Sequence, residues 1–356
     1  MKSTLHPLEF VDTGALLKSC AVQFEESFRR AVRKTGIQQD HFYSIAGRRV
    51  KLTFASAALA AQFNPALEHV RTAPGPAELE VGLWEGGDEA APRLPEAWEQ
   101  ARYFPRGRIA GMEHPDLRLV VLPGVASLSL VDLAASRGWY CAEQAARVAY
   151  WESAAPLRNM LHAWLARRGV FLLHGAAIGT EKGVVLLVGK GGSGKSTTAL
   201  LGLTANMQYL GDDYCLCEMS GAQPTVHALY NSAKVCDDAM PRLNGFHASL
   251  GNPHRRSDEK AVFFLSGTHD AQLPQRLPLR AILLPHIAPD RPVGLERVSP
   301  GQALAALSPS TIMQLPDSDQ HDLAFHAALV KTVPAYRLFL NEDRAGILRA
   351  INGVLT

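Results

Sequence analysis

A glycine-rich segment in the middle of the sequence contains the residue types that bind linked phosphate groups. Gly189–Ser196 reads Gly-Lys-Gly-Gly-Ser-Gly-Lys-Ser and matches the pattern G-x-x-x-x-G-K-[ST] in full. Glycines let the backbone curl until successive N–H groups point at phosphate oxygens. The lysine adds a mobile positive charge, and the final hydroxyl is an oxygen ligand of the kind that Mg²⁺ prefers. The segment therefore predicts a binding site for ATP and Mg²⁺.

The residues of this loop have separate expected roles. Lys195 is expected to reach the β- and γ-phosphates, and the hydroxyl of Ser196 to ligate Mg²⁺. The apolar run 184–188 predicts a strand that enters the loop, and 197–203 predicts a helix that leaves it and adds its positive N-terminal end. The expected nucleotide contacts are Gly189, Lys190, Gly191, Gly192, Ser193, Gly194, Lys195, Ser196 and Thr197.

A pair of acidic residues follows the loop at an interval that accommodates a helix, a loop and a strand. If Asp212 and Asp213 lie in extended backbone, their side chains point to opposite faces. One can then face Mg²⁺ while the other orients an acceptor hydroxyl and takes its proton, and phosphoryl transfer needs both. An acidic turn that caps a strand is the alternative without catalysis.

A histidine precedes the loop. His174 follows the apolar run 170–173, which predicts a strand next to the one that enters the loop. A single histidine is more often structural, but at this place it can lie beside the aspartates, orient one of them and shift its pKa.

Basic residues downstream can stabilise the charge that develops on the transferred phosphoryl group. Lys234 and Lys260 are the first candidates, because Lys260 directly precedes the predicted strand 261–265. Arg255 and Arg256 lie in a polar, turn-rich segment that serves equally well as a solvated surface loop.

Composition restricts the classes of protein that this chain can belong to. It has 356 residues, 47% hydrophobic and 20% charged, with a formal net charge of +2, so it is a core-forming globular chain without an electrostatic reason to bind nucleic acid or an anionic membrane. No apolar run is long enough to span a membrane, and Met1–His6 lacks the apolar core of a signal peptide, so we expect a cytoplasmic protein. Five scattered cysteines predict no disulfide scaffold, and Cys215 and Cys217 are expected to pack in the core of a strand.

Hydrophobic periodicity divides the chain into two regions. The first, residues 1–165, is expected to be a mixed α/β domain that recognises substrate or a leader segment, and the second, 166–356, the catalytic domain. The expected elements of the first region are a helix over 14–35, a hairpin over 42–54, a helix over 56–70, strands at 79–84, 117–122 and 127–130, and a helix over 141–168 broken near Pro156. Those of the second are strands at 170–173, 183–188 and 214–218 and a helix over 197–206, which together predict an α/β nucleotide-binding core.

The order and spacing of these motifs resemble the HPr kinase/phosphorylase family. The matching features are Leu-His174-Gly, the phosphate loop, a leucine-rich helix and Leu-Gly-Asp212-Asp213, which together cover about residues 166–235. The resemblance implies an α/β (α+β) fold with a P-loop kinase core of the HPr kinase/phosphoenolpyruvate carboxykinase type, and a serine kinase that acts on a small protein. It also implies that His174 and Lys195 are catalytic, that Asp213 accepts the proton and that Asp212 supports the metal or the histidine.

The layout of the whole chain is similar to HPr-kinase-related proteins, including lasso peptide precursor kinases. The shared features are a β-rich N-terminal region, a strand that exits into His-Gly-Ala, and the C-terminal Val-Pro-Ala-Tyr-x-Leu at Val333–Leu338. This resemblance implies a hydroxyl of a precursor peptide, such as a serine, as the acceptor. The Glu-x-Arg-Gly-x-Gly signature of the HPr kinases is not recognisable, and Leu229–Lys234 stands in its place.

Other functions are compatible with a phosphate-binding loop, because ATPases, GTPases and kinases all use one. The sequence shows neither the N-K-x-D motif of a GTPase nor the apolar run ending in Asp-Glu of a transport ATPase. Two alternatives to a peptide kinase stay open: a nucleotide-gated module that binds a peptide without phosphoryl transfer, and a small-molecule kinase. The oligomeric state is open too, with a homo-oligomer among the options.

Overall fold

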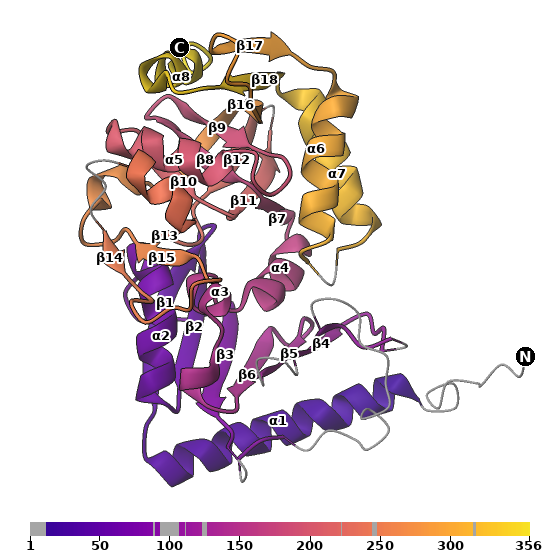
Figure 1. Cartoon of the computed structure of the whole chain (residues 1–356). Coiled ribbons are helices and arrows are strands. Elements are labelled where there is room, and N and C mark those ends of the chain that lie inside the picture. Colours follow the sequence, from indigo (N-terminus) through magenta and orange to yellow (C-terminus); the bar gives the residue numbers. More distant parts are fainter. Residues whose placement is uncertain are drawn as a thin grey trace, which may run out of the picture.

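The computed structural model describes residues 12–87, 90–92, 107–110, 112–122, 127–221, 223–243, 248–315 and 318–356. These residues form a mixed α/β structure with sheets of six, nine and three strands. The N-terminal elements form the lower part of the molecule in Figure 1, and the strands and helices after residue 170 form the upper part. Met1–His6, the residues of the expectation about a signal peptide, lie outside the described ranges.

The lower part is a six-stranded sheet in the order β1-β2-β3-β6-β5-β4, flanked by helices. Its strands are β1 (Gln39–Ile45), β2 (Arg48–Phe54), β3 (Leu79–Glu85), β4 (Leu117–Leu122), β5 (Ser127–Asp132) and β6 (Arg137–Ala142). Its helices are α1 (Thr13–Thr35), α2 (Ala57–Leu67), α3 (Tyr150–Ala154) and α4 (Arg158–Ala166), with short 3₁₀ turns at Glu68–Val70 and Ala145–Arg147. The predicted helices over 14–35 and 56–70, the hairpin and the strands at 79, 117 and 127 are confirmed.

The caps and the apolar face of helix α1 are all encoded in its own segment of the sequence, which is why the helix could be predicted. Asp12 caps the first turn by accepting hydrogen bonds from backbone N–H groups at 3.0 and 3.1 Å, and Gly36 ends the helix with a φ of 65°. The buried face places Phe24 and Phe28 against Trp84 of β3, with ring centroids 6.1 and 5.8 Å apart. An amphipathic helix with two good caps is determined by its own sequence.

The predicted helix over 141–168 is wrong at its beginning. Residues 137–142 form β6, which pairs with both β3 and β5, and helical structure appears only from residue 145 onward. Trp139 and Tyr140 favour a strand, and the pairing on both sides overrides the helix propensity of the alanines that follow. The break near Pro156 is confirmed, because α3 and α4 lie on either side of it.

The upper part is built around the nine-stranded sheet. Its main path follows the order β10-β8-β9-β16-β12-β11-β7, and β17 and β18 extend it beside β16. These strands are β7 (Val170–His174), β8 (Ala176–Thr180), β9 (Gly183–Leu187), β10 (Gln208–Gly211), β11 (Tyr214–Ser220), β12 (Gln223–His227), β16 (Arg276–Ile287), β17 (Gly294–Arg297) and β18 (Ala335–Leu340). The small sheet contains β13 (Ser232–Val235), β14 (Ser249–Leu250) and β15 (Ala261–Phe264), in the order β13-β15-β14.

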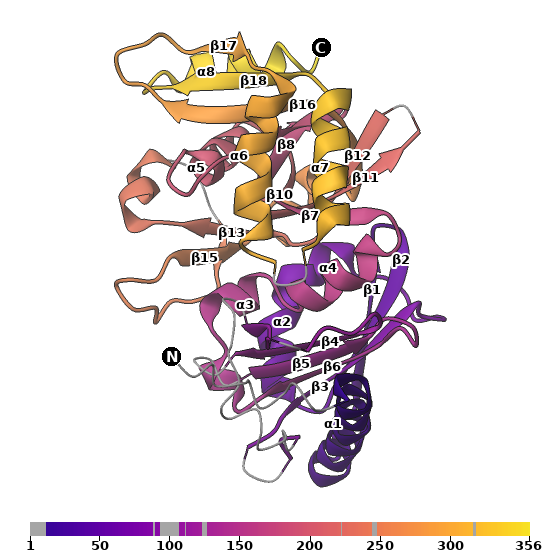
Figure 2. The ribbon, with the colours of Figure 1, turned by 90° about the vertical axis from the view of Figure 1, so that its right-hand side faces the viewer.

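Helices cover the large sheet. They are α5 (Lys195–Thr204), α6 (Pro300–Ile312), α7 (Gln320–Thr332) and α8 (Arg344–Asn352), with short 3₁₀ turns at Asp237–Arg242 and Asp270–Gln272. Figure 2 shows α6 and α7 side by side in front of the sheet, where they contact β7, β12 and β16. Both begin with a complete capping box, at Ser299 and Asp319. Within the described residues, no helix combines the length and the apolarity needed to cross a membrane.

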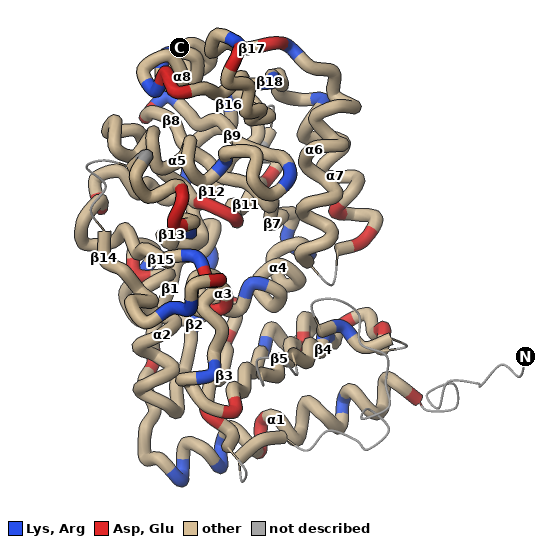
Figure 3. Tube along the Cα trace, in the orientation of Figure 1, with Lys and Arg blue, Asp and Glu red and all other residues tan. Residues whose placement is uncertain are grey.

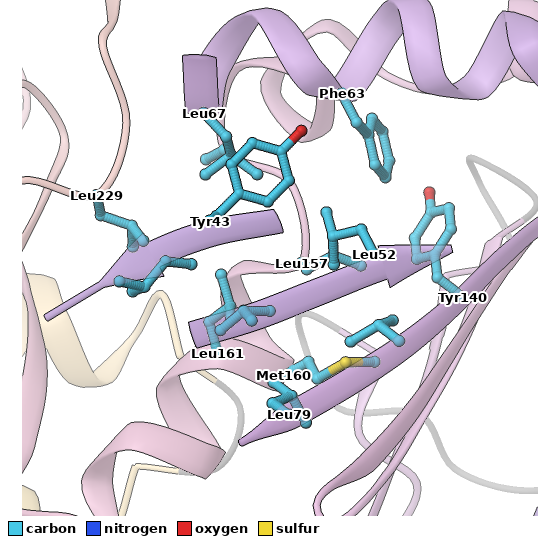
Figure 4. Packing of buried hydrophobic residues seen from close by; sticks show 14 of the residues in the cluster. Tyr43, Leu52, Phe63, Leu67, Leu79, Tyr140, Leu157, Met160, Leu161 and Leu229 are labelled. Atoms are coloured by element: carbon cyan, nitrogen blue, oxygen red, sulfur yellow. The ribbon is translucent and has the colours of Figure 1, made fainter. Parts of the chain in front are cut away.

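One hydrophobic cluster joins the two parts of the molecule. It contains Tyr43 and Leu67 from the lower part, Leu157 and Leu161 around the start of α4, and Leu229 from the segment after β12, all buried (Figure 4). The boundary predicted near residue 166 coincides with the end of α4, and apolar packing continues across it. The division into domains 1–165 and 166–356 stays a prediction.

Candidate phosphate-binding and transfer site

The glycine-rich loop joins a fully buried strand to a helix, as its sequence predicts. Strand β9 is parallel to β16 and antiparallel to β8, so it ends in the interior of the sheet. Gly189, Gly192 and Gly194 have φ values of 141°, 78° and 100°, which favour glycine strongly. A Cβ at Gly194, the residue that caps α5, would lie 2.7 Å from Cδ1 of Leu340. The local geometry therefore requires glycine at this end of the loop.

Lys195 points back into the loop from the first turn of α5. Its Nζ donates hydrogen bonds to the carbonyl oxygens of Gly189 at 2.7 Å and Lys190 at 3.1 Å. Its side chain is buried, and burial is the main reason that its pKa is lowered, although Asp212 and Asp213 act in the opposite direction. The positive charge therefore lies inside the curve of the loop, next to the acidic pair.

The acidic pair lies in the turn between β10 and β11. Asp213 has a φ of 68°, a left-handed conformation that few non-glycine residues adopt. The condition considered from the sequence, that both aspartates lie in extended backbone, is therefore not met at Asp213. The turn itself separates the carboxylates, directing Asp212 toward Ser196 and Asp213 toward Lys234.

The carboxylate of Asp212 has the properties of a metal ligand. One oxygen accepts from the backbone N–H of Lys234 at 3.4 Å, and Ser196 lies close enough to the side chain to lower its pKa. The other oxygen, Oδ1, is buried and has no hydrogen-bond partner in the part of the chain that the structure describes. Burial first, and the charge of Asp213 second, raises the pKa of Asp212 to about 6. A cation beside Ser196 would satisfy the free oxygen and remove this penalty, so the two side chains fit Mg²⁺.

The carboxylate of Asp213 is held in its charged form. It forms an ion pair with Nζ of Lys234, and its Oδ1 lies 3.9 Å from Nε2 of His174. Burial by itself would raise the pKa of Asp213, but Lys234 and then His174 outweigh burial and hold the pKa well below its usual range. The site thus contains an ionised oxygen that can accept a hydrogen bond from an acceptor hydroxyl.

The two lysines proposed from the sequence are placed differently. Lys234 belongs to β13 and contacts Asp213; although burial opposes its charge, Asp213 and Tyr214 raise its pKa. Lys260 is exposed just before β15, yet close enough to lower the pKa of Lys195 and of Asp213. Figure 3 shows acidic and basic segments together around β13.

The two arginines proposed with them form ion pairs elsewhere. Arg255 pairs with Asp237 at 2.6 Å, and Arg256 with Asp258 at 2.6 Å. The structure therefore brings Lys234 into contact with the acidic pair and Lys260 within its electrostatic range, whereas the two arginines are paired with other carboxylates.

His174 reaches the site by a different route from the one expected. Its strand, β7, pairs with β11 rather than with β9, whose neighbours are β8 and β16. Its backbone N–H donates to Oγ1 of Thr311 at 3.0 Å, and its Nε2 lies 3.2 Å from Nε2 of Gln314. Burial is the main reason that its pKa falls to about 4, so the ring is neutral at pH 7. Because the amide of Gln314 donates to Nε2, the proton of the neutral ring lies on Nδ1, and Nε2 has no hydrogen to donate to Asp213.

Sequence reasoning missed an aromatic and an arginine beside these groups. The ring of Tyr214 has the guanidinium of Arg158 at 4.9 Å and Nζ of Lys234 at 5.8 Å. Its hydroxyl accepts from Nη1 of Arg158 at 2.7 Å and donates to Oε1 of Gln314 at 2.5 Å. Tyr214 follows Asp213 directly, which was the available signal, whereas no local pattern connects Arg158 to the loop.

Mg²⁺ is the metal that this donor set fits. In the described ranges, no group of three or more His, Cys, Asp or Glu side chains is arranged to hold a metal ion. Mg²⁺ does not need such a cage, because it is commonly held by one or two protein oxygens together with phosphate oxygens and waters. Cys215 and Cys217 are both buried in β11, as predicted for core residues.

Asp212→Asn is expected to stabilise the protein above pH 6. A carboxyl whose folded pKa is raised contributes stability that is fully present below its unfolded pKa near 4 and lost as the pH rises through about 6. At pH 7.5 the ionised Asp212 therefore lowers the free energy of unfolding, and asparagine removes this cost. Urea unfolding of both proteins at about pH 4 and pH 7.5 checks this: the stabilities should converge at the lower pH and diverge at the higher.

Magnesium provides the control for that variant. Mg²⁺ with ATP should raise the melting temperature of the wild type more than that of Asp212→Asn, because only the wild type gains a metal contact there. Equal stabilities at both pH values, or an equal response to Mg²⁺ with ATP, would contradict the role assigned to the buried oxygen.

The comparisons with known proteins give little beyond this geometry. No protein-family model and no curated protein sequence matches the chain. Among solved structures, it is similar to the Hpr(Ser) kinase/phosphatase from Coxiella burnetii, at 9% sequence identity and a TM-score of 0.29, over 51% of this chain and 93% of that chain. A likeness of this degree defines neither the fold nor the reaction, which rest on the chain's own residues.

Proposed function

We propose that the protein is an ATP- and Mg²⁺-dependent kinase that transfers the γ-phosphoryl group to a hydroxyl of a peptide or small protein. The observation that carries this proposal is the convergence of Lys195, Ser196, Asp212 and Asp213 at one buried site, although they come from a helix N-terminus and a separate turn. A site that only bound nucleotide would need the first three of these groups. The ionised Asp213, held by Lys234, adds a group with the chemistry to handle an acceptor.

Each residue then has a task. The loop N–H groups and Lys195 hold the phosphate chain, and Ser196 and Asp212 hold Mg²⁺, which neutralises charge on the phosphate oxygens. Asp213 orients the acceptor hydroxyl in line with the phosphorus and takes its proton as the new oxygen–phosphorus bond forms and the bond to the β-phosphate breaks. Phosphoryl transfer through a loose transition state requires only a weakly basic proton acceptor. The carboxylate of Asp213 has a low pKa and is therefore adequate for this role.

The nature of the acceptor rests on resemblance. The similarity of the motifs to the HPr kinase/phosphorylase family, and of the layout to lasso peptide precursor kinases, supports a serine of a peptide. The need for ATP agrees with a cytoplasmic protein, and the balanced charge agrees with a partner other than nucleic acid or membrane.

Transfer of label from ATP tests this proposal. Wild-type protein with Mg²⁺, ATP labelled at the γ-phosphate and a pool of serine-containing peptides should give labelled peptide, and ATP labelled at the α-phosphate should not. Label that enters a small hydroxyl compound but no peptide would favour a small-molecule kinase. Peptide affinity that rises with a non-hydrolysable ATP analogue, without any labelled product, would favour a nucleotide-gated binding module.

A further inference from the structure

A large pocket lies next to the site, between the lower part of the molecule and the small sheet. Its volume is about 1570 Å³. One wall comes from α2 and the segment around Val148, and the other from β14, β15 and the loop between them. Small-molecule sites usually occupy about 300–1,000 Å³. The pocket is therefore of a size to hold a segment of polypeptide.

The wall of this pocket has unused hydrogen-bonding groups. Gln62 Oε1, His69 Nε2 and Arg255 Nε are buried and have no hydrogen-bond partner among the residues that the structure describes. Nδ1 of His69 lies 3.3 Å from Nδ2 of Asn231, an amide donor, so Nδ1 accepts and Nε2 carries the ring proton. Two donors and one acceptor are therefore buried just behind the wall, on side chains that line the pocket. A polypeptide backbone offers the complementary C=O and N–H groups.

A pair of neighbouring strands in the small sheet links the wall of the pocket to the transfer site. Lys234 of β13 pairs directly with Val262 of β15, so the two side chains lie on the same face, about 5 Å apart at Cβ. Val262 lines the pocket, whereas Lys234 contacts Asp213. A segment lying along Val262 and Phe264 therefore leads to the ionised carboxylate.

Charge in the pocket is mostly neutralised. Arg147 pairs with Glu143 at 2.6 Å, Arg255 with Asp237, and Arg256 with Asp258. The lining also contains the apolar side chains of Val148 and Phe264. Such a wall recognises the backbone and apolar side chains of a segment rather than a strongly charged ligand.

We propose that this pocket, lined by α2, the segment around Val148 and β14–β15, binds the acceptor as an extended polypeptide segment and delivers its hydroxyl to Asp213 past Lys234. The inference rests on the proposed function and adds the place and the manner in which the acceptor is bound. The side chains of Gln62, His69 and Arg255 turn toward the bound segment, so that their unused groups pair with its backbone.

A bulky side chain in the pocket tests this assignment. Ala61 and Ala58 are both exposed on α2, but only Ala61 lines the pocket, so Ala58→Trp is a matched control for Ala61→Trp. The probe is a synthetic peptide library with one fixed serine and randomised neighbours. Ala61→Trp should raise KM for the library about tenfold or more, because the indole ring occupies the pocket and the segment loses an anchoring contact. The affinity for ATP should stay unchanged. Ala58→Trp should behave as the wild type.

The outcomes separate this inference from the proposed function. Phosphorylation of the library with the same KM in the wild type and in Ala61→Trp would leave the kinase in place and overturn the pocket. Failure of the wild type to phosphorylate any library peptide would overturn the proposed function and the inference with it. Amide hydrogen exchange gives a second readout: the library should slow exchange in residues 57–70 and 249–264, and protection confined to other segments would also overturn the pocket.

Discussion

Lys195→Met is expected to lower kcat/KM for phosphoryl transfer by about 10³-fold, because a preorganised cation at the transferring phosphate is worth that much in comparable sites. Methionine keeps the length and apolar stem of the side chain, so the loop can retain its fold. The two hydrogen bonds from Nζ to the loop carbonyls are lost, and a water molecule in the space left by the ammonium group can replace the lysine as their donor.

Lys190 provides the matched control for this variant. Its expected contact with the nucleotide is made by its backbone N–H, which Lys190→Met retains, whereas its side chain is exposed, so the variant removes only a charge from the same loop. We expect its kcat/KM to stay within about threefold of the wild type, as for a screened surface charge. Single-turnover transfer with γ-labelled ATP measures both. Similar losses in the two variants would show that general loop charge, rather than the position of Lys195, drives the reaction.

Asp213→Asn is expected to lower kcat by about 10²–10⁴-fold, the range for loss of a positioned proton acceptor. Binding of ATP should persist, because Asp213 faces Lys234 and His174 rather than the loop. Isothermal titration with a non-hydrolysable ATP analogue checks binding, and quench-flow checks transfer. Transfer at the wild-type rate in this variant would contradict the assigned role.

The stability of that variant needs its own control. Asparagine leaves Lys234 as a largely buried ammonium without its partner, which destabilises a protein by about 3–5 kcal/mol. The double variant Asp213→Asn with Lys234→Met removes both charges, so its free energy of unfolding should return toward that of the wild type. The double variant should still fail to transfer the phosphoryl group. Recovery of stability without recovery of activity separates the chemical role of Asp213 from its structural one.

The phosphate loop was predictable because its determinants are contiguous. Strand β9, the glycines and helix α5 follow one another in the chain, and the positive φ values of Gly189, Gly192 and Gly194 demand the residue type that the sequence shows. The interval to Asp212 and Asp213 was informative for the same reason, since one helix and one strand fill it.

The other features of the site depend on contacts between distant segments. β8 reads Ala-Ala-Ile-Gly-Thr, a weak strand signal, and it forms because β9 and β10 pair with it on either side. Its presence moves β7, and with it His174, away from β9. Arg158 meets Tyr214 only because α4 packs below β7 and β11, and the pocket exists only because α2 and β15 face each other. Periodicity within a segment contains no information about these neighbours.

The stoichiometry of products tests the central claim most directly. Wild-type protein, Mg²⁺, ATP and a serine peptide are incubated, and ADP, free phosphate and phosphopeptide are quantified in the same sample. We predict one phosphopeptide for each ADP, with the peptide heavier by a single phosphoryl group, and no ADP above background with Lys195→Met. ADP matched by free phosphate, with the peptide unchanged, would contradict the assignment of a phosphotransferase.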